Sequence, residues 1–298
     1  MKCGITPVIA TARPLEVAKY IATKAGKKFQ GYVIATNGAM IYDFKEDSII
    51  SNNSLSKEQV NSLIGLAEDF KLEYEFMTEE CEVADINYAD RRGKDSIYMH
   101  MENDGVINLN GAGFNFQENM RQYANEHDIP LFSISGTKEE LQEIRKAIEV
   151  SNIGVQMTDP DDRSDASDEN NKIYRFDIMK EGVTKAEAIK KIQEELNITE
   201  QQVIVIGDGG NDIEMFEHAG LSIAMRNANS AVKREAKVIT FDNNEQGGVG
   251  TALLALYNFM KKREVKKEKG IDLKAHKKCR PPVIQKGIIK LPNTEGER

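Results

Sequence analysis

The sequence predicts an α/β fold in which a mostly parallel sheet is interrupted along the chain by a long insertion. Short apolar runs alternate with amphipathic, helix-length segments near the start of the chain and again after about residue 175, and this alternation is typical of parallel sheets. A stretch with its own helix and strand signals separates the two parts, over residues 51–174. The length of 298 residues suits one large domain or two modest ones.

The first part is predicted as strand, helix, strand and hairpin. Each apolar run ends in residues that favour a turn: Arg13-Pro14 follows the first run, and Asn37-Gly38 follows the second. Glycine at such a place permits a tight turn of the backbone. The four elements are expected at Thr6–Thr11, Leu15–Ala25, Tyr32–Thr36 and Ile41–Ile50.

The insertion shows helices with clear start signals. Ser56 and Gln59 form a capping-box pattern ahead of apolar residues at helical spacing, and Thr137 is a suitable N-cap for a second helix. The acidic segment Asp159–Asn170 lacks the pattern of a calcium-binding loop and is predicted as a mobile hairpin loop. The other predicted elements are strands at Leu72–Phe76, Ser96–Met101 and Pro130–Ser135 and helices at Gln117–Glu126 and Lys138–Val150.

After the insertion the strand–helix alternation resumes. The predicted elements are Tyr174–Ile178, the helix Lys185–Leu196, and the strands Val203–Gly207, Leu221–Met225 and Lys237–Phe241. The expected layout is therefore a core made of residues 1–50 and 175–262, with residues 51–174 as an inserted α/β domain.

Composition argues against several classes of protein. The chain has 40 Lys and Arg against 48 Asp and Glu, a net charge of −8, whereas nucleic-acid-binding proteins are usually basic. Its apolar runs fall short of the roughly 18 residues that a membrane span needs, and the N-terminus has no signal-peptide pattern. Three widely separated cysteines favour reduced thiols. We expect a cytoplasmic protein without a membrane segment, for which nucleic acid is an unlikely partner; its oligomeric state is not predicted.

The C-terminal residues 263–298 differ from the rest in charge. Counted from Lys261, the last 38 residues hold 13 Lys and Arg against five Asp and Glu, and three of the seven prolines. Such a composition is typical of a solvated, poorly ordered basic tail. Two alternatives stay open: an arm that binds an anionic partner, and an added edge strand formed by VIQKGIIKL.

The segment GDGGND carries the clearest chemical signal. Asp208 and Asp212 follow the predicted strand Val203–Gly207 directly, and ligands of open α/β sheets bind beyond the carboxyl ends of strands. Two carboxylates four residues apart can converge on one hard cation such as Mg²⁺. The alternative is a solvated turn capped by Asp and Asn.

Two further residues occupy suitable positions. Thr11 ends another predicted parallel strand, so its hydroxyl could bind a phosphate oxygen, although it could equally cap a helix. Lys185 opens the helix after GVT and could place a positive charge beside the same phosphate, although most lysines lie at the surface. Their order along the chain strengthens the prediction of a phosphate site.

The segments IATAR, TNGA, GVTKAEAI and GDGGNDIEMFEHAGLSIAMRNA closely resemble the haloacid-dehalogenase (HAD) superfamily, and specifically the Cof-type phosphatases of subclass IIB. The resemblance covers about residues 1–260 and implies a Rossmann-like, HAD-like core with an α/β cap at 51–174 that selects the substrate. It implies that Asp208 and Asp212 hold Mg²⁺ and that Thr11 and Lys185 are catalytic. The residues implied to bind substrate are Thr11, Ala12, Arg13, Asn37, Lys185 and Asn211, with Ala12 in place of a common glycine.

One motif of this superfamily does not occur in the 298 residues. Members begin with a strand that ends in Asp-x-Asp-Gly-Thr, in which the first Asp accepts the phosphoryl group and the second serves as acid and base. That strand lies between the strands of Thr11 and Asp208, so the first core strand is expected to be missing and its two neighbours to lack a partner. A misplaced start or a fragment is our favoured explanation over a chain that has lost the reaction.

The leading prediction is a Mg²⁺-dependent phosphatase of small phosphorylated metabolites such as sugar phosphates. The resemblance implies an aspartyl-phosphate intermediate, whose charge Lys185 and Mg²⁺ offset. The 298 residues alone are expected to be inactive because they hold no nucleophile. The alternative is a non-catalytic, phosphate- or metabolite-binding remnant; a dinucleotide-binding enzyme is disfavoured because no GxGxxG follows an early strand.

Overall fold

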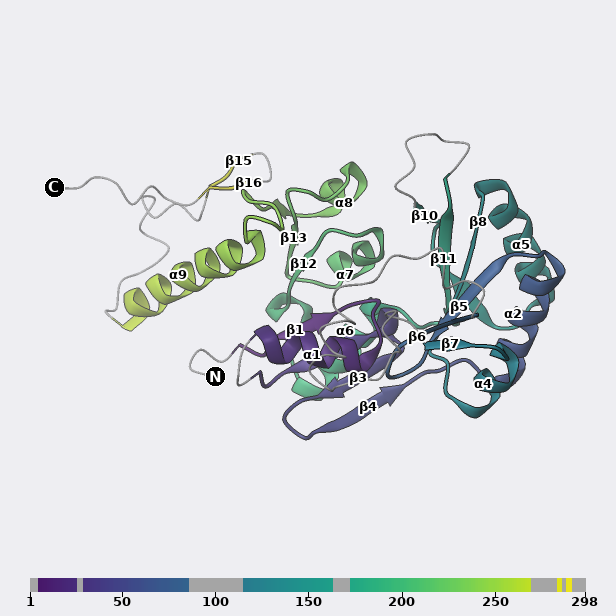
Figure 1. Ribbon diagram of the computed structural model, residues 1–298. Helices are drawn as coiled ribbons and strands as arrows, with labels where there is room; N and C mark the ends of the chain where they lie inside the picture. Colours follow the sequence, from purple (N-terminus) through teal and green to yellow (C-terminus); the bar gives the residue numbers. More distant parts are fainter. Residues whose placement is uncertain are drawn as a thin grey trace. The chain divides into compact units, whose positions relative to one another are not determined.

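The computed structural model describes residues 5–25, 29–85, 115–162, 172–268, 283–285 and 288–290. The chain forms two compact units, Met1–Ile192 and Gln193–Arg298, and their elements are labelled in Figure 1. The boundary falls inside helix α6 (Lys185–Leu196). The predicted α/β fold is confirmed; residues 1–50 and 175–192 of the predicted core belong to the first unit, and residues 193–262 belong to the second.

The first unit opens with a four-stranded sheet in the order β1-β2-β3-β4. Strands β1 (Val8–Ala10) and β2 (Tyr32–Ala35) are parallel and are connected by helix α1 (Leu15–Ala25). Strands β3 (Met40–Asp43) and β4 (Ser48–Asn52) continue the sheet as an antiparallel hairpin. The predicted succession of strand, helix, strand and hairpin is confirmed.

A second sheet of seven strands forms most of the insertion. Its order is β10-β11-β8-β5-β6-β7, with β9 paired to the other end of β11. The β6–β7 pair is parallel and the others are antiparallel. The strands are β5 (Glu73–Met77), β6 (Glu82–Asp85), β7 (Asn115–Gln117), β8 (Leu131–Gly136), β9 (Val155–Met157), β10 (Asp161–Asp162) and β11 (Tyr174–Lys180).

Capping residues set the ends of the helices in this part of the chain. Helix α2 (Lys57–Asp69) starts at the predicted capping box, where Ser56 and Gln59 satisfy each other's backbone N–H groups. Thr137 does the same with Glu140 at the start of α5 (Lys138–Ser151). Helix α4 (Met120–Glu126) starts at Asn119. The predicted positions of these helices are confirmed to within a few residues.

The alternation of side chains along the strands divides the core of the first unit into two clusters. Phe76, Phe132 and Phe176, on β5, β8 and β11, pack with apolar residues of α2, α4 and α5, which gather beside this sheet in Figure 1. The strand neighbours Met77 and Leu131 instead join a cluster that contains residues of α1, β2 and β3. The second cluster therefore connects the two sheets of the first unit.

The second unit is a sheet in the order β12-β13-β14-β16-β15. Strands β12 (Ile204–Gly207), β13 (Leu221–Ala224) and β14 (Val238–Ile239) are parallel, as the alternating pattern predicts. Helices α7 (Ile213–Glu217), α8 (Ser230–Glu235) and α9 (Gly248–Glu268) follow them in turn. Among the residues that the structure describes, no helix is long and apolar enough to span a bilayer.

Several elements differ from those predicted. Strand β11 belongs to the seven-stranded sheet, so the insertion extends to about residue 180. The sequence gives no signal for β6, β7, β9 or β10, which have two to four residues each. In the tail, β16 (Ile288–Lys290) pairs with β14, and β15 (Val283–Gln285) pairs with β16, as in the edge-strand alternative. The predicted strand Ser96–Met101 and most of the acidic loop lie outside the described residues.

Strands β1 and β12 each lie at an end of their sheet, within the described residues. Val8 in β1 is 40% exposed and Ile204 in β12 is 44% exposed. Both positions are exposed although the apolar runs Thr6–Thr11 and Val203–Gly207 suit buried strands, because each strand has a paired neighbour on one side only. This finding agrees with the expectation that both strands lack a partner.

Candidate functional site

The predicted site residues lie on both units. Thr11, Ala12, Arg13, Asn37 and Lys185 belong to the first unit, and Asp208, Asn211 and Asp212 belong to the second. The cap residues considered for substrate recognition, His100, Glu102, Asn108 and Asn110, lie outside the described residues.

In the first unit, two turns follow the carboxyl ends of neighbouring parallel strands. Thr11 to Arg13 come directly after β1, and the short 3-10 turn Thr36–Gly38 comes directly after β2. The Thr11 hydroxyl accepts the backbone N–H of Arg13 at 3.2 Å. Thr11, Ala12 and Arg13 are all half-buried. The hydroxyl therefore shapes this turn, while the residues around it remain partly open to solvent.

The turn Thr36–Gly38 is bound to the first turn through its backbone. The N–H of Thr36 donates to the carbonyl of Arg13 at 2.9 Å, and the N–H of Asn37 donates to the carbonyl of Thr11 at 3.1 Å. The backbone φ angles of Thr36, Asn37 and Gly38 are 46°, 53° and 107°. Residues other than glycine seldom adopt positive φ angles. The Asn37 side chain is 3% exposed, and its Nδ2 donates to Asp177 Oδ2 at 3.1 Å.

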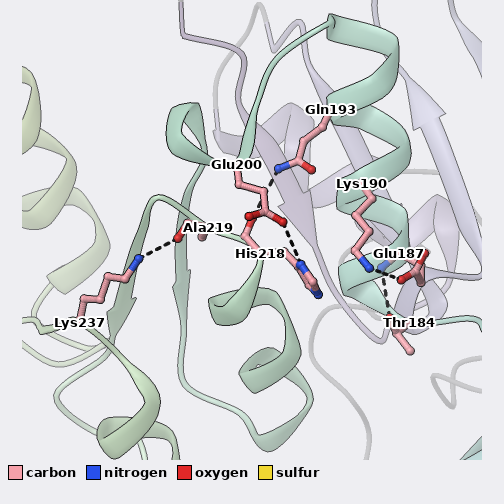
Figure 2. A network of polar contacts seen from close by, with 8 residues as sticks. All are labelled: Thr184, Glu187, Lys190, Gln193, Glu200, His218, Ala219 and Lys237. Carbon is pink, nitrogen blue, oxygen red and sulfur yellow. Dashed lines mark hydrogen bonds and ion pairs between the residues drawn. The ribbon is translucent and has the colours of Figure 1, made fainter.

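Lys185 is the first residue of α6. Thr184 caps this helix, because its hydroxyl accepts the N–H of Glu187 at 3.1 Å, as Figure 2 shows. Gly38 packs directly against this helix start: a Cβ atom on Gly38 would lie 2.2 Å from the carbonyl oxygen of Thr184. The Lys185 side chain is 6% exposed. The first unit thus connects Thr11, Asn37 and Lys185 through the single turn Thr36–Gly38.

In the second unit, the GDGGND loop folds back on the end of β12. Asp212 is 7% exposed, and its Oδ2 accepts the N–H groups of Asp208 and Gly209 at 3.0 and 3.1 Å. A Cβ atom on Gly207 would lie 2.6 Å from Asp212. Only glycine at position 207 therefore allows the Asp212 carboxylate to occupy this place beside the loop.

Asp208 is exposed, but its carboxylate has a fixed neighbour. Asn227 donates from Nδ2 to Asp208 Oδ2 at 3.2 Å, and its Oδ1 accepts the N–H of Asn244 at 3.1 Å. Sequence reasoning did not single out Asn227. Its position was a usable signal, because Asn227 follows β13, the parallel neighbour of β12, and the carboxyl ends of parallel neighbours meet at one edge of the sheet.

Asn211, the remaining predicted residue, is exposed in the same loop. Three further polar contacts of this unit lie outside the loop. Gln193 donates to the carbonyl of His218 at 3.4 Å, and the His218 ring contacts Glu200 at 3.1 Å; Lys237 donates to the carbonyl of Ala219 at 3.0 Å (Figure 2). These contacts fix the segments that lead into β12, β13 and β14.

The donor set suits Mg²⁺. Asp208 and Asp212 supply carboxylate oxygens, and Mg²⁺ is commonly held by one or two carboxylates together with water and substrate phosphate. Within the described residues, no group of three or more His, Cys, Asp or Glu side chains is arranged to hold a metal ion. The loop thus fits a cation that takes few protein ligands better than a fully protein-coordinated metal such as structural zinc.

The fold is that of an α/β protein of the hydrolase class that the family comparison identifies. The sequence profile of the haloacid dehalogenase-like hydrolases matches residues 1–253. The chain belongs to this family and, within it, to the HAD-type phosphatases.

Three proteins illustrate the similarity. The 5-amino-6-(5-phospho-D-ribitylamino)uracil phosphatase YitU of Bacillus subtilis is 26% identical over 216 residues, which cover 72% of each chain. A haloacid dehalogenase-like hydrolase from Bacteroides thetaiotaomicron superposes with a TM-score of 0.65 at 22% identity, over 86% of this chain and 88% of the other. The subclass IIB sugar phosphatase BT4131 gives 0.62 at 20% identity, over 86% of both chains. At these identities the two structures support the fold.

Proposed function

We propose that the chain is a Mg²⁺-dependent phosphomonoesterase of the Cof type that acts on small phosphorylated metabolites such as sugar phosphates. The proposal rests mainly on the way the GDGGND loop holds its two carboxylates. One carboxylate, Asp212, is held by the loop's own N–H groups, and the other, Asp208, is exposed and oriented by Asn227. A capped turn without a metal would need neither the second carboxylate nor the contact that orients it.

In this proposal Asp208 and Asp212 hold Mg²⁺, which when bound offsets the charge of the phosphoryl group. Lys185 adds a positive charge for the same purpose. Thr11, Ala12 and Arg13 offer a hydroxyl, backbone N–H groups and a guanidinium to phosphate oxygens, and Asn211 offers an amide. We propose that Asn37 acts on the phosphate through the turn that it anchors.

The substrate class follows from the relatives. YitU is named for a phosphate on a ribityl chain and BT4131 is called a sugar phosphatase; both names describe a phosphate monoester on a polyhydroxylated carbon chain. We propose the same class for this chain, with the seven-stranded sheet and its helices as the cap that selects among such substrates.

The non-catalytic alternative also has an observation behind it. The 298 residues contain no Asp-x-Asp-Gly-Thr segment, so no aspartate of that kind can accept the phosphoryl group. A polypeptide of these residues alone would bind Mg²⁺ and phosphate without hydrolysis. Binding and turnover therefore need separate experiments.

The test of the site is Mg²⁺ titration of the 298-residue protein by calorimetry. Asp208→Asn should reduce the affinity for Mg²⁺ at least tenfold and leave the thermal unfolding temperature within a few degrees, because the side chain is exposed. Glu214→Gln is the matched control, since Glu214 is an exposed acid on the following helix α7. Equal Mg²⁺ affinity of Asp208→Asn and wild type would contradict the assignment.

Turnover is tested with an Asp-x-Asp-Gly-Thr strand and helix supplied upstream of residue 1. Release of phosphate from a panel of sugar and polyol phosphates should then depend on Mg²⁺, and Asp208→Asn should abolish it. Metal-independent turnover would contradict the proposed reaction.

A further inference from the structure

A buried side-chain hydrogen bond connects the two sheets of the first unit. Asn37 follows β2 of the four-stranded sheet, and Asp177 lies in the middle of β11 in the seven-stranded sheet. Nδ2 of Asn37 donates to Oδ2 of Asp177 at 3.1 Å, and both residues are buried. A charged acceptor in such surroundings makes a stronger hydrogen bond than a neutral one.

The Asp177 carboxylate is itself held in a fixed orientation. Its Oδ1 accepts the hydroxyl of Ser133 at 2.8 Å and lies 3.2 Å from Nε of Arg175. The backbone N–H of Asp177 donates to the hydroxyl of Thr158 at 2.9 Å. Because neighbours on the sheet occupy Oδ1, Oδ2 is directed to Asn37.

The turn that Asn37 belongs to has an unfavourable backbone. Thr36, a β-branched residue, has a φ of 46°, and Asn37 and Gly38 also have positive φ angles. Thr36 Oγ1 is buried and has no hydrogen-bond partner within the described part of the chain. Such conformations persist only where the surrounding structure holds them in place, and the hydrogen bond to Asp177 is a contact that can do so.

The same turn sets the place of the proposed phosphate-binding residues. Its N–H groups bind the carbonyls of Thr11 and Arg13, and Gly38 lies against the start of α6, where Lys185 begins the helix. A shift of the turn would therefore displace the Thr11–Arg13 turn and the start of α6 together.

We propose that Asp177 is a positioning residue: through Asn37 it holds the turn Thr36–Gly38, and through that turn it holds Thr11, Arg13 and Lys185 in the arrangement that binds phosphate. The phosphate part of this inference rests on the proposed function, whereas the holding of the turn does not. Asp177 itself contacts no substrate in this account.

The first measurement is amide hydrogen exchange of the 298-residue protein, followed in peptides that contain Thr36 and Asn37. Asp177→Asn should raise exchange at these two amides at least tenfold, because the amide cannot accept from Asn37 and also satisfy Ser133 and Arg175. Asn37→Gly should do the same, since glycine keeps the positive φ and removes the donor. Ser135→Ala is the matched control: it removes another buried hydroxyl from the same strand, β8, and should change exchange less than twofold.

The second measurement is calorimetric titration with inorganic phosphate in the presence of MgCl₂. Asp177→Asn and Asn37→Gly should each weaken phosphate binding about tenfold, and the pair Asn37→Asp with Asp177→Asn should restore it, because donor and acceptor are exchanged. If Asp177 had a purely structural role, its substitution would lower the unfolding temperature, but the double variant would not recover the affinity for phosphate.

Unchanged exchange at Thr36 and Asn37 in both single variants would overturn the inference. Raised exchange together with unaltered phosphate affinity would also overturn the inference, because the turn would then be mobile while phosphate binding stayed the same. If the wild type binds no phosphate, the proposed function fails, and the exchange measurement alone decides whether Asp177 holds the turn. Should Asp177→Asn not fold, Asn37→Gly gives the same decision from the other side of the hydrogen bond.

Discussion

Gly207 ends β12 at the point where the carboxylate of Asp212 folds back over the strand. A Cβ atom here would lie 2.6 Å from Asp212, far inside normal contact distance. We expect Gly207→Ala to displace Asp212, to destabilise the fold by roughly 1–3 kcal/mol as in other overpacked sites, and to weaken Mg²⁺ binding. Urea unfolding and Mg²⁺ calorimetry measure the two effects.

The same loop offers a control for this prediction. A Cβ atom on Gly210 would have no neighbour within 4 Å, so Gly210→Ala should keep both stability and Mg²⁺ affinity close to those of wild type. Equal losses in the two variants would mean that the loop needs flexibility in general rather than space for Asp212.

At the scale of single residues, sequence reasoning found the groups that follow strands and not the groups that orient them. Asp208, Asp212 and Thr11 could be proposed because each lies directly beyond a predicted strand. The contacts of Asn37 with Asp177 and of Asp208 with Asn227 join residues 140 and 19 positions apart. The pair of Asn37 and Asp177 depends on how two different sheets meet, which nothing in the local sequence specifies, whereas Asn227 could have been inferred from its place after the strand next to β12.

The seven-stranded sheet encloses an ion pair between Arg175 on β11 and Glu75 on β5, both of which are buried. Glu75→Ala removes one of two carboxylates beside the Arg175 guanidinium, since Asp177 Oδ1 lies 3.2 Å from Nε. We therefore expect a loss below the roughly 3–5 kcal/mol of a fully unpaired buried charge, and about 1–3 kcal/mol for the buried polar groups that lose a partner, measured by urea unfolding.

An exposed ion pair of the same part of the chain provides the comparison. Arg121 contacts Glu68 at 2.9 Å at the surface, where such pairs contribute about 0–1 kcal/mol. Glu68→Ala should accordingly have a small effect. If the two variants lose similar stability, the ion pair of Arg175 is not isolated from solvent.

The turn between β5 and β6 contains Cys81, whose pKa burial raises to about 11 from an ordinary value of 9.0. The native state thus favours the neutral thiol, so stability from this group is fully present below pH 9 and is lost as the pH rises through 11. Relative to Cys81→Ala, the wild type should lose about 1 kcal/mol between pH 8 and pH 10. Chemical unfolding at a series of pH values tests this; parallel curves for the two proteins would refute it.

At the scale of elements, helices were easier to predict than strands. Ser56 and Thr137 mark the starts of α2 and α5 because a capping box depends on residues three positions apart. Strands β6 and β7 have four and three residues, and they are strands because of the partners they meet. Strand β11 is a similar case. Its sequence suits a strand of the core sheet as well as one of the insertion, and its pairing with β8 places it in the seven-stranded sheet.

For the whole molecule, the central prediction concerns turnover. A polypeptide of residues 1–298 should not hydrolyse p-nitrophenyl phosphate or sugar phosphates at any Mg²⁺ concentration, because it contains no Asp-x-Asp-Gly-Thr segment to accept the phosphoryl group. Addition of a βα unit of roughly 25–30 residues that carries this motif should give activity and a cooperative thermal transition.

Contaminating phosphatases are the main risk in this experiment. Lys185→Ala should abolish turnover that comes from this protein and leave a contaminant unaffected. Activity of the 298-residue protein that Lys185→Ala removes would show that another residue is the nucleophile, and the proposed roles at the site would then need revision.

The insertion begins and ends at one place. Ser54 and Ser56 at its start and Lys180 at its end line the same cavity, of about 470 Å³. Because the chain leaves and returns at neighbouring points, the corresponding segment of a relative could replace the insertion without a long detour of the remaining chain. The replacement must keep the acceptor that Asp177 offers to Asn37. Under the proposed function, such an exchange would change selectivity while the turn Thr36–Gly38 stays in place, both in the laboratory and in the divergence of related sequences.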